Sequence, residues 1–433
     1  MSRGPAQTMP TQHRTFERKT FTMALLTRRG WRRGAAGIAA AALTVGISLA
    51  APATAATATI TIDTTIEWYD VTATAVATGT RPQVTSNRAW AISWLAAARA
   101  VRTAPASPAY QDAALASAVH TALSALIPDA TPTLDAALRT TLDRIPDGRA
   151  KDRGRAAGQR EALSLVAERS GDGLDPASVN TPYPAPPAAP GIWQPTPPSF
   201  TAAQQAGNRF ATPFLLDRAD RYRLGPPPAL GSARYRADLA EVRAYGAAGS
   251  TVRTPQQTDT ATFWLGSSLT LYTGILRAAL AQSTRSTAGR ASLVAVFHVA
   301  LVDTQIATSD TKYAYLRWRP VTAIRADGDP GWTPLHDTPA HPDYPSGHNT
   351  YAGAAEGVLT ALTGARAREA YAITSPTQPG VTRTYTDWRR PTQENVDARV
   401  WSGIHTRTAD QAGVRLGRDV AAHAVRNAAR LFD

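Results

Sequence analysis

Apolar residues recur at helical spacing along most of this chain. In Arg88–Ala100, for example, Trp90, Trp94 and Ala98 share one face of a helix. Few stretches show the period of two that is typical of strands, and Thr57–Ile66 is the best of them. The sequence therefore predicts an all-α fold made of two four-helix-bundle-like units.

One proline-rich segment interrupts the helical pattern. Pro182–Ser199 contains eight prolines and cannot form a regular helix. Ile192 and Trp193 favour burial, so we expect an ordered crossing loop rather than a flexible linker. It would lie in an N-terminal helical region, residues 56–250, that precedes a C-terminal domain, residues 251–433. Further helices are predicted at Tyr110–Leu126, Thr133–Ile145, Arg155–Arg169, Arg236–Tyr245, Gln256–Gln282, Thr287–Thr311, Asn349–Thr363 and Asp410–Leu431.

Residues 1–55 have the layout of an export signal. A basic segment, residues 28–33, precedes a largely apolar run, residues 34–51, and a small-x-small cleavage site at Ala53–Ala55. The apolar run is near the lower limit for spanning a bilayer, so a stable membrane anchor is not expected. Met23 is a plausible true start, and the arginine pairs permit twin-arginine export. We expect an exported, extracellular bacterial protein.

The charge and the cysteine content exclude several classes of function. The chain has no cysteine, so disulfides, thiolate metal sites and thiol nucleophiles are excluded. Its net charge is +13, of which residues 1–55 carry +7, leaving +6 for the rest. This remainder shows no long basic run, so nucleic-acid binding is not expected.

Two cations seven residues apart form the first of three motifs in the C-terminal domain. Lys312 lies near the end of one predicted helix, and Arg319 precedes Pro320. The proline disfavours α backbone at Arg319, so the chain should turn there and let both cations point at one place. A solvated helix end would also explain them. However, lysine occurs only three times in the chain, and Trp318 indicates a partly buried setting.

The second motif is a Ser–Gly turn that leads into a helix. Ser346 and Gly347 would offer a hydroxyl and free backbone amides to an anion. His348 at the helix start is a credible proton donor or acceptor. The simpler interpretation is a serine N-cap.

The third motif is Arg399 with His405, six residues apart. Arginine binds oxygens bidentately, and His405 could attack phosphorus or coordinate a metal oxyanion. Each residue alone could be an exposed arginine or a core histidine. The three motifs together predict a site for an oxyanion such as phosphate or vanadate.

Other kinds of site fit the sequence less well. Several acidic and histidine side chains close in sequence could suggest zinc: His336, Asp337, His341, Asp343 and His348. No HExxH spacing occurs, and cysteine is absent. Neither a GxSxG elbow nor a phosphate-binding P-loop motif is present.

The order Lys-x6-Arg-Pro, Pro-Ser-Gly-His and Arg-x5-His resembles the motifs of the vanadium-dependent haloperoxidase and type 2 phosphatidic acid phosphatase superfamily. The longer strings Trp318–Arg325, Tyr344–His348 and Gly403–His405 are similar to its bacterial haloperoxidase-like branch, as is Gly191–Pro198. The resemblance covers roughly residues 60–433 and implies the all-α fold of the haloperoxidase/acid phosphatase type.

The resemblance implies a role for each cation and for the turn. Vanadate or phosphate oxygens would be held by Lys312, Arg319, Ser346, the Gly347 amide and Arg399.

The resemblance also implies roles for three histidines. His348 would be the acid–base residue, and His405 would ligate vanadium or become a phosphorylated nucleophile. His341 resembles the histidine of algal bromoperoxidases, where fungal chloroperoxidases have phenylalanine, and would tune the halide site. Two positions depart from the family: Ala398, where many relatives have serine, and Asp410, five residues after His405, where the phosphatases place an aspartate four after. The second departure puts a phosphatase-type orienting His–Asp pair in doubt, and with it the nucleophile role of His405.

Three functions remain open from the sequence. The first is a secreted haloperoxidase with vanadate as cofactor, acting on hydrogen peroxide and a halide. The second is a phosphatase without cofactor, hydrolysing phosphomonoesters through a phosphohistidine. The third is a secreted non-catalytic surface protein with a relic site.

Overall fold

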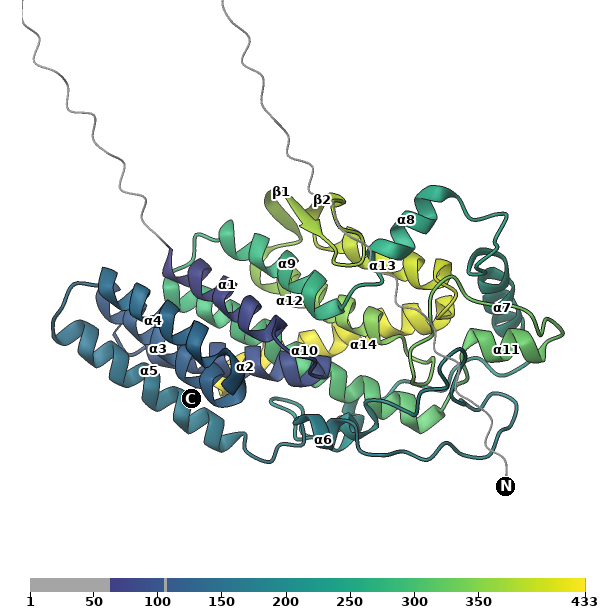
Figure 1. Cartoon of the computed structure of the whole chain (residues 1–433), viewed down its shortest axis with the longest axis horizontal. Helices are drawn as coiled ribbons and strands as arrows, with labels where there is room; N and C mark the ends of the chain where they lie inside the picture. Colours follow the sequence, from purple (N-terminus) through teal and green to yellow (C-terminus); the bar gives the residue numbers. More distant parts are fainter. Residues whose placement is uncertain (1–62, 105–106, 433) are drawn as a thin grey trace, which may run out of the picture. The chain divides into compact units, whose positions relative to one another are not determined.

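The predicted helices form the framework of the computed structural model, which describes residues 63–104 and 107–432 (Figure 1). The predicted export signal therefore lies outside the described residues. The first part of the chain contains α1 (Thr64–Ala77), α2 (Gln83–Val101), α3 (Pro108–Leu126), η1 (Pro128–Ala130), α4 (Thr131–Arg144), α5 (Arg149–Glu168), α6 (Pro176–Val179), η2 (Ala206–Phe210), η3 (Ala219–Tyr222) and α7 (Ala233–Tyr245).

The second part carries the three motifs. Its elements are α8 (Pro255–Phe263), α9 (Ser268–Ala281), α10 (Thr287–Tyr315), α11 (Pro320–Ala326), α12 (Gly347–Thr363), β1 (Arg366–Thr374), β2 (Thr382–Asp387), α13 (Arg389–Trp401), α14 (Arg407–Arg426) and η4 (Ala428–Leu431). The all-α prediction is confirmed, with one antiparallel hairpin, β1–β2, added to it.

Helix α10 is the central helix of the described chain. Ser286 caps its start by accepting from the Gly289 amide, and Leu316 ends it in the left-handed conformation at φ 48°. It packs against α2, α12 and α14. By length and composition α10 could span a membrane, but 94% of its most apolar stretch is buried inside the protein. We therefore describe it as a core helix.

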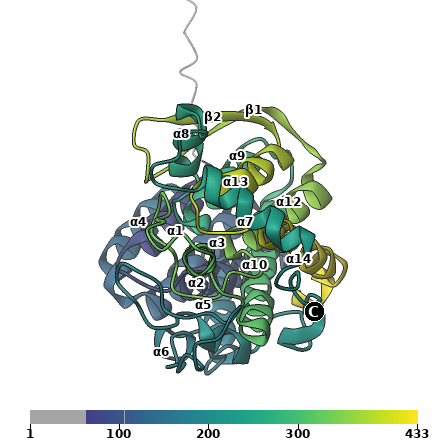
Figure 2. The ribbon, with the colours of Figure 1, turned by 90° about the vertical axis from the view of Figure 1, so that its right-hand side faces the viewer.

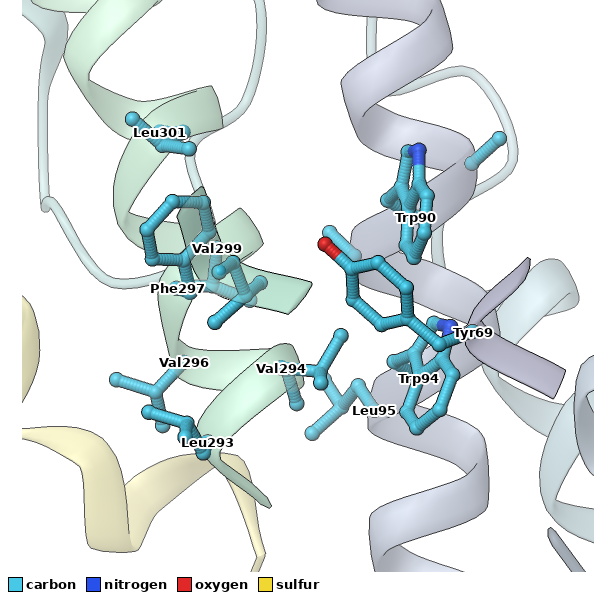
Figure 3. Close-up of a cluster of buried hydrophobic side chains, with 14 of the residues drawn as sticks. Tyr69, Trp90, Trp94, Leu95, Leu293, Val294, Val296, Phe297, Val299 and Leu301 are labelled. Carbon is cyan, nitrogen blue, oxygen red and sulfur yellow. The ribbon is translucent and has the colours of Figure 1, made fainter. Parts of the chain in front are cut away.

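The first half of α10 faces α1 and α2 across a dense apolar layer. Figure 3 shows Phe297 and Val294 of α10 opposite Tyr69, Trp90 and Trp94. The Tyr69 and Trp90 ring centroids lie 4.7 Å apart and the rings are tilted. Burial of such large side chains contributes on the order of 2 kcal/mol each, which fixes α10 as the axis of the fold.

Helices α12 and α14 approach each other closely because glycine lies in their contact. A Cβ atom at Gly417 would lie 2.0 Å from the Thr350 carbonyl oxygen, so no other residue fits there without movement. This contact joins the helix that begins at Gly347 to the helix that follows His405. The second and third motifs are thereby brought side by side.

The proline-rich segment forms no regular helix or strand, as predicted. Trp193 is fully buried, and its amide donates to the Leu316 carbonyl at 2.7 Å. The Trp318 amide donates in turn to Gly191 at 2.9 Å. The segment is therefore an ordered loop that is pinned to the end of α10.

The structure corrects two expectations. Gln256–Gln282 is not one helix: it breaks between α8 and α9, at Trp264–Ser267. The strand-like pattern of Thr57–Ile66 is also wrong where the structure describes it, because Asp63 accepts from two amides and starts α1 at Thr64.

The α8–α9 break is held in place by the segment that links β1 to β2. Ser375 donates through its hydroxyl to the Phe263 carbonyl at 2.6 Å, and Thr377 donates to Thr262 at 2.7 Å. Figure 1 and Figure 2 both show the hairpin beside α8 and α9. This arrangement leaves the carbonyls of Trp264 and Gly266 free to bind side chains of the site described below.

Candidate active site

A cavity of about 190 Å³ lies at the C-terminal end of α10. Five of the predicted site residues line this cavity: Lys312, His341, Gly347, His348 and His405. The described residues that line it include no acidic side chain. The other three, Arg319, Ser346 and Arg399, are buried beside them, so the structure brings all eight together.

Lys312 and Arg319 lie on either side of the turn that ends α10. The Lys312 ammonium donates to the Pro342 carbonyl at 2.6 Å, and only 4% of the residue is exposed. Arg319 is fully buried with extended backbone, as Pro320 predicted. Its guanidinium donates to the carbonyls of His341 at 2.6 Å and Ile404 at 2.7 Å. The first motif thus gives two rigidly held cations.

Ser346 occupies the N-cap position of α12 without capping the helix through its side chain. Its hydroxyl lies 3.5 Å from the Asn349 side-chain nitrogen, and the side chain also forms a hydrogen bond with Asp410. The first amides of α12 therefore remain available to an anion. The simple serine-cap interpretation is wrong for this residue.

His348 and Arg399 are held by the α8–α9 break. Nε2 of His348 lies 3.1 Å from the Gly266 carbonyl oxygen, and because a carbonyl only accepts, this nitrogen carries the hydrogen. The unprotonated nitrogen is then Nδ1. Arg399 donates to the Trp264 carbonyl at 3.3 Å. Its Nε is buried and forms no hydrogen bond to any described residue, so one donor is left over.

His405 pairs with a carboxylate that the sequence did not assign to it. Its Nδ1 lies 2.6 Å from Oδ1 of Asp343, and both residues are 1% exposed. Thr406 donates to the other carboxylate oxygen at 2.8 Å. Asp410 instead accepts from Asn349 at 2.7 Å. Asp410 therefore does not pair with His405, as its spacing in the sequence indicated. Asp343 forms the pair with His405 instead.

Burial and like charges shift the pKa values of these groups. Burial lowers the pKa of His405 well below its usual value, and Arg319 and Lys312 add to this effect. Burial and the neighbouring Arg399 likewise lower the pKa of His348. Burial also lowers the pKa of Lys312, with Arg319 as the next cause. A site of neutral histidines surrounded by cations has an excess of positive charge, which a bound anion would balance.

His341 lies beside Arg319 rather than in a metal cluster. Its Nδ1 accepts from Arg319 at 3.0 Å, and the ring lines the cavity. His336 is bound elsewhere, with Nδ1 3.0 Å from the Ser402 hydroxyl. Among the residues that the structure describes, no three acidic or histidine side chains converge as a metal site. This geometry gives no support to the zinc alternative.

The sequence did not indicate the residues that form the outer wall of the cavity. They are mostly amides and hydroxyls: Gln83, Gln204, Gln205, Gln305, Thr308 and Ser309. Gln83 comes from α2 and its amide contacts Gln305 of α10 at 3.4 Å. These positions belong to three separate segments, and no local motif marks them.

Comparison with known proteins identifies the relatives of this chain. Residues 292–433 match the model of the VCPO second helical-bundle domain. Vanadium chloroperoxidase of Curvularia inaequalis is 32% identical over a stretch that covers 30% of this chain. That stretch spans only 28% of the length of the relative.

Solved structures match over a larger part of the chain. A bacterial vanadium-dependent iodoperoxidase superposes with a TM-score of 0.71 at 22% identity, over 84% of this chain and 94% of the other. An apo-type bacterial vanadium-dependent chloroperoxidase gives 0.67 at 16% identity, over 82% and 96%. The chain thus has the helical fold of the bacterial vanadium-dependent haloperoxidases, and its residues 292–433 are similar to the VCPO second helical-bundle domain.

Proposed function

We propose that this protein is an exported vanadate-dependent haloperoxidase that oxidises halide with hydrogen peroxide. The observation that carries the proposal is a cavity without acidic lining that Lys312 and His405 line, with Arg319 and Arg399 buried beside them. The relatives named above support the choice of vanadium over other oxyanion centres.

The residues present fit vanadate. Lys312, Arg319, Arg399, Ser346 and the Gly347 amide would hold its oxygens, and His405 would be the ligand through Nε2. The buried Arg399 Nε is a donor that such an oxyanion would satisfy. Vanadate, when bound, supplies a centre at which peroxide becomes reactive toward halide.

The chain itself would hold charge and move protons. The three cations would neutralise the oxyanion and polarise it. His348, held by Gly266, would accept or release a proton at Nδ1. His341 would tune the halide site from its place beside Arg319.

The first experiment measures vanadium in the purified protein and then bromination after loading with vanadate. We expect bromination that requires both peroxide and bromide, and its loss in His405→Ala. Absence of bromination from loaded protein that still hydrolyses phosphomonoesters would reject the proposal. Full activity of both His405→Ala and His348→Ala would instead favour a non-catalytic relic site.

A second candidate is phosphomonoester hydrolysis, and the His405–Asp343 pair favours it. Nε2 of His405 would attack phosphorus, the ester P–O bond would break, and protonated His348 would give its proton to the leaving alcohol. Water would then hydrolyse the phosphohistidine. Trapping a phosphate group on His405 with a chromogenic phosphomonoester would establish this activity.

Export and domain organisation belong to the same proposal. The signal in residues 1–55 would be removed after Ala55, leaving a protein that acts outside the cell. The boundary between residues 250 and 251 stays a prediction. N-terminal sequencing of the protein from culture medium checks the first point, and a mature chain that retains residues 1–55 would contradict it.

A further inference from the structure

Asp343 contacts the central histidine of the site, His405, at Nδ1. We propose that Asp343 is a positioning residue that locks His405 in the tautomer with hydrogen on Nδ1 and a lone pair on Nε2. The inference rests on the proposed function only in taking an oxyanion as the ligand, and it holds for vanadate and phosphate alike.

One short contact assigns the tautomer. A carboxylate only accepts hydrogen bonds, so Nδ1 of His405 donates to Asp343 across 2.6 Å. In a neutral ring the hydrogen is then on Nδ1, and Nε2 carries the lone pair. NH1 of Arg319 lies 3.0 Å from Nε2 and 3.4 Å from Nδ1, so this guanidinium contacts both nitrogens and does not distinguish them.

The carboxylate is itself fixed, so it can orient the ring. Thr406 donates to its second oxygen at 2.8 Å, and the same hydroxyl accepts from the Ala409 amide as the N-cap of α14. The Asp343 amide donates to the Arg317 carbonyl at 2.9 Å. Backbone and side chain are therefore both held, which a carboxylate that only balanced charge would not need. Such outer partners of a metal-ligating histidine set its tautomer and orientation.

Charge balance is the rival explanation for Asp343. Asp410 provides a control because it is a second fully buried carboxyl group near Arg399 and Lys312, and burial raises its pKa well above the usual value. Its hydrogen bond goes to Asn349 and not to His405. Asp410→Asn alters a buried carboxyl group near these cations without removing a partner of His405, whereas Asp343→Ala removes the hydrogen-bond acceptor of His405. The two carboxylates can therefore be separated by experiment.

The experiment compares Asp343→Ala, Asp343→Asn and Asp410→Asn with the unaltered protein. The first readout is the ¹⁵N spectrum of histidine-labelled protein without oxyanion, which distinguishes the two ring nitrogens. The second is calorimetric binding of inorganic vanadate and of inorganic phosphate. Neither readout depends on enzymatic turnover.

We expect the unaltered protein to show His405 as the Nδ1–H tautomer with a strongly downfield Nδ1 proton. Asp343→Ala should give mixed tautomers and a loss of vanadate affinity on the order of 10- to 100-fold. Asp410→Asn should keep the Nδ1–H tautomer of His405, whether or not its vanadate affinity changes. If Asp343→Ala fails to fold, Asp343→Asn should move the Nδ1 proton upfield, because a neutral acceptor replaces the carboxylate.

Three outcomes would overturn the positioning role. One is the absence of a hydrogen-bonded Nδ1 proton in the unaltered protein. Another is an unchanged His405 tautomer in Asp343→Ala, and the third is an unchanged Nδ1 proton in Asp343→Asn. Failure of the proposed function looks different: the unaltered protein would lack bromination while its tautomer and oxyanion binding stay as expected.

Discussion

The two halves of α10 are equally buried but contain opposite kinds of residue. The first half, Leu293–Val302, is almost wholly apolar and packs on α2. The second half is just as inaccessible, yet it is mostly polar: Asp303, Thr304, Gln305, Thr308, Ser309, Asp310, Thr311 and Lys312. Burial therefore identifies a hydrophobic core only where the buried side chains are apolar.

The polar half is stable because most of its groups have partners outside the helix. Asp310 forms an ion pair with Arg223 through two contacts of 2.8 and 2.6 Å. Thr308 donates to the Thr350 hydroxyl at 2.9 Å, which ties α10 to α12. Lys312 binds the loop that carries the second motif. Apolar burial in the first half stabilises the fold, whereas burial of charged groups in the second half costs free energy.

The largest expected effect tests the apolar half. Phe297→Ala removes a fully buried ring and should lower the free energy of unfolding by about 3–5 kcal/mol. Phosphate affinity of the folded protein should stay unchanged, because the ring is remote from the cavity lining. Urea denaturation with calorimetry checks both, with the exposed Leu163→Ala as control. A large loss of phosphate affinity would show that the two halves are not separate in function.

The second prediction tests the polar half at the cavity. Lys312→Ala should reduce kcat of the active enzyme by about 10²- to 10³-fold, as loss of one preorganised donor does. It should cost less stability than Phe297→Ala, because it also removes a charge that burial disfavours. Steady-state kinetics and urea denaturation of the two variants make the comparison. Retention of kcat within a few fold would contradict the assignment of Lys312 to the site.

The third prediction separates polar residues of the site from polar residues of the scaffold. Asp303 accepts from the amides of Phe214, Leu215 and Leu216 at 2.7, 2.8 and 3.0 Å. Asp303→Ala should cost about 1–3 kcal/mol of stability by leaving buried amides without an acceptor. Asp303→Asn should cost less, since one acceptor oxygen remains. Neither should change phosphate affinity, and a change of tenfold or more would place Asp303 in the site.

The smallest predicted effect concerns acid stability in the apolar half. Burial lowers the pKa of His298 well below its usual value, and Nδ1 lies 2.6 Å from the Asn87 side-chain oxygen. The unfolded chain therefore binds the proton more readily than the folded one. This contribution to stability is full above about pH 6.5 and falls as the pH drops, by up to about 1.4 kcal/mol per unit.

His298→Gln should remove this part of the pH dependence. The stability difference between the two proteins should shrink between about pH 7.5 and about pH 5, measured by urea denaturation at each pH. A difference that stays constant over this range would mean that His298 does not titrate between the folded and unfolded states.

The sequence predicted the framework because most helices carry a long apolar face. The break between α8 and α9 was missed, since four residues suffice to end one helix and start another. Helix α13, Arg389–Trp401, was also missed because it is charged, has little apolar periodicity and contains a proline in its first turn. Both omissions matter to the site, because α13 carries Arg399 and the break supplies its carbonyl partner.

The site residues were predictable because each motif is local. Lys312 with Arg319, and Ser346 with its two neighbours, have spacings that are visible in a single segment. The partner of His405 was not predictable, because Asp343 lies 62 residues away and only the fold brings them together. An aspartate that looked like part of a zinc cluster proved to be the hydrogen-bond acceptor of the central histidine.

The amide and hydroxyl wall of the cavity has a consequence for chemical durability. Thioethers and thiols are the side chains that oxidants attack most readily. Residues 24–433 contain neither methionine nor cysteine, and among the described residues that line the cavity Tyr313 is the one phenol. A reactive halogen species formed in this cavity would meet glutamine and threonine before any sulfur atom. Oxidative inactivation of the protein by the product of its own reaction would then be slow.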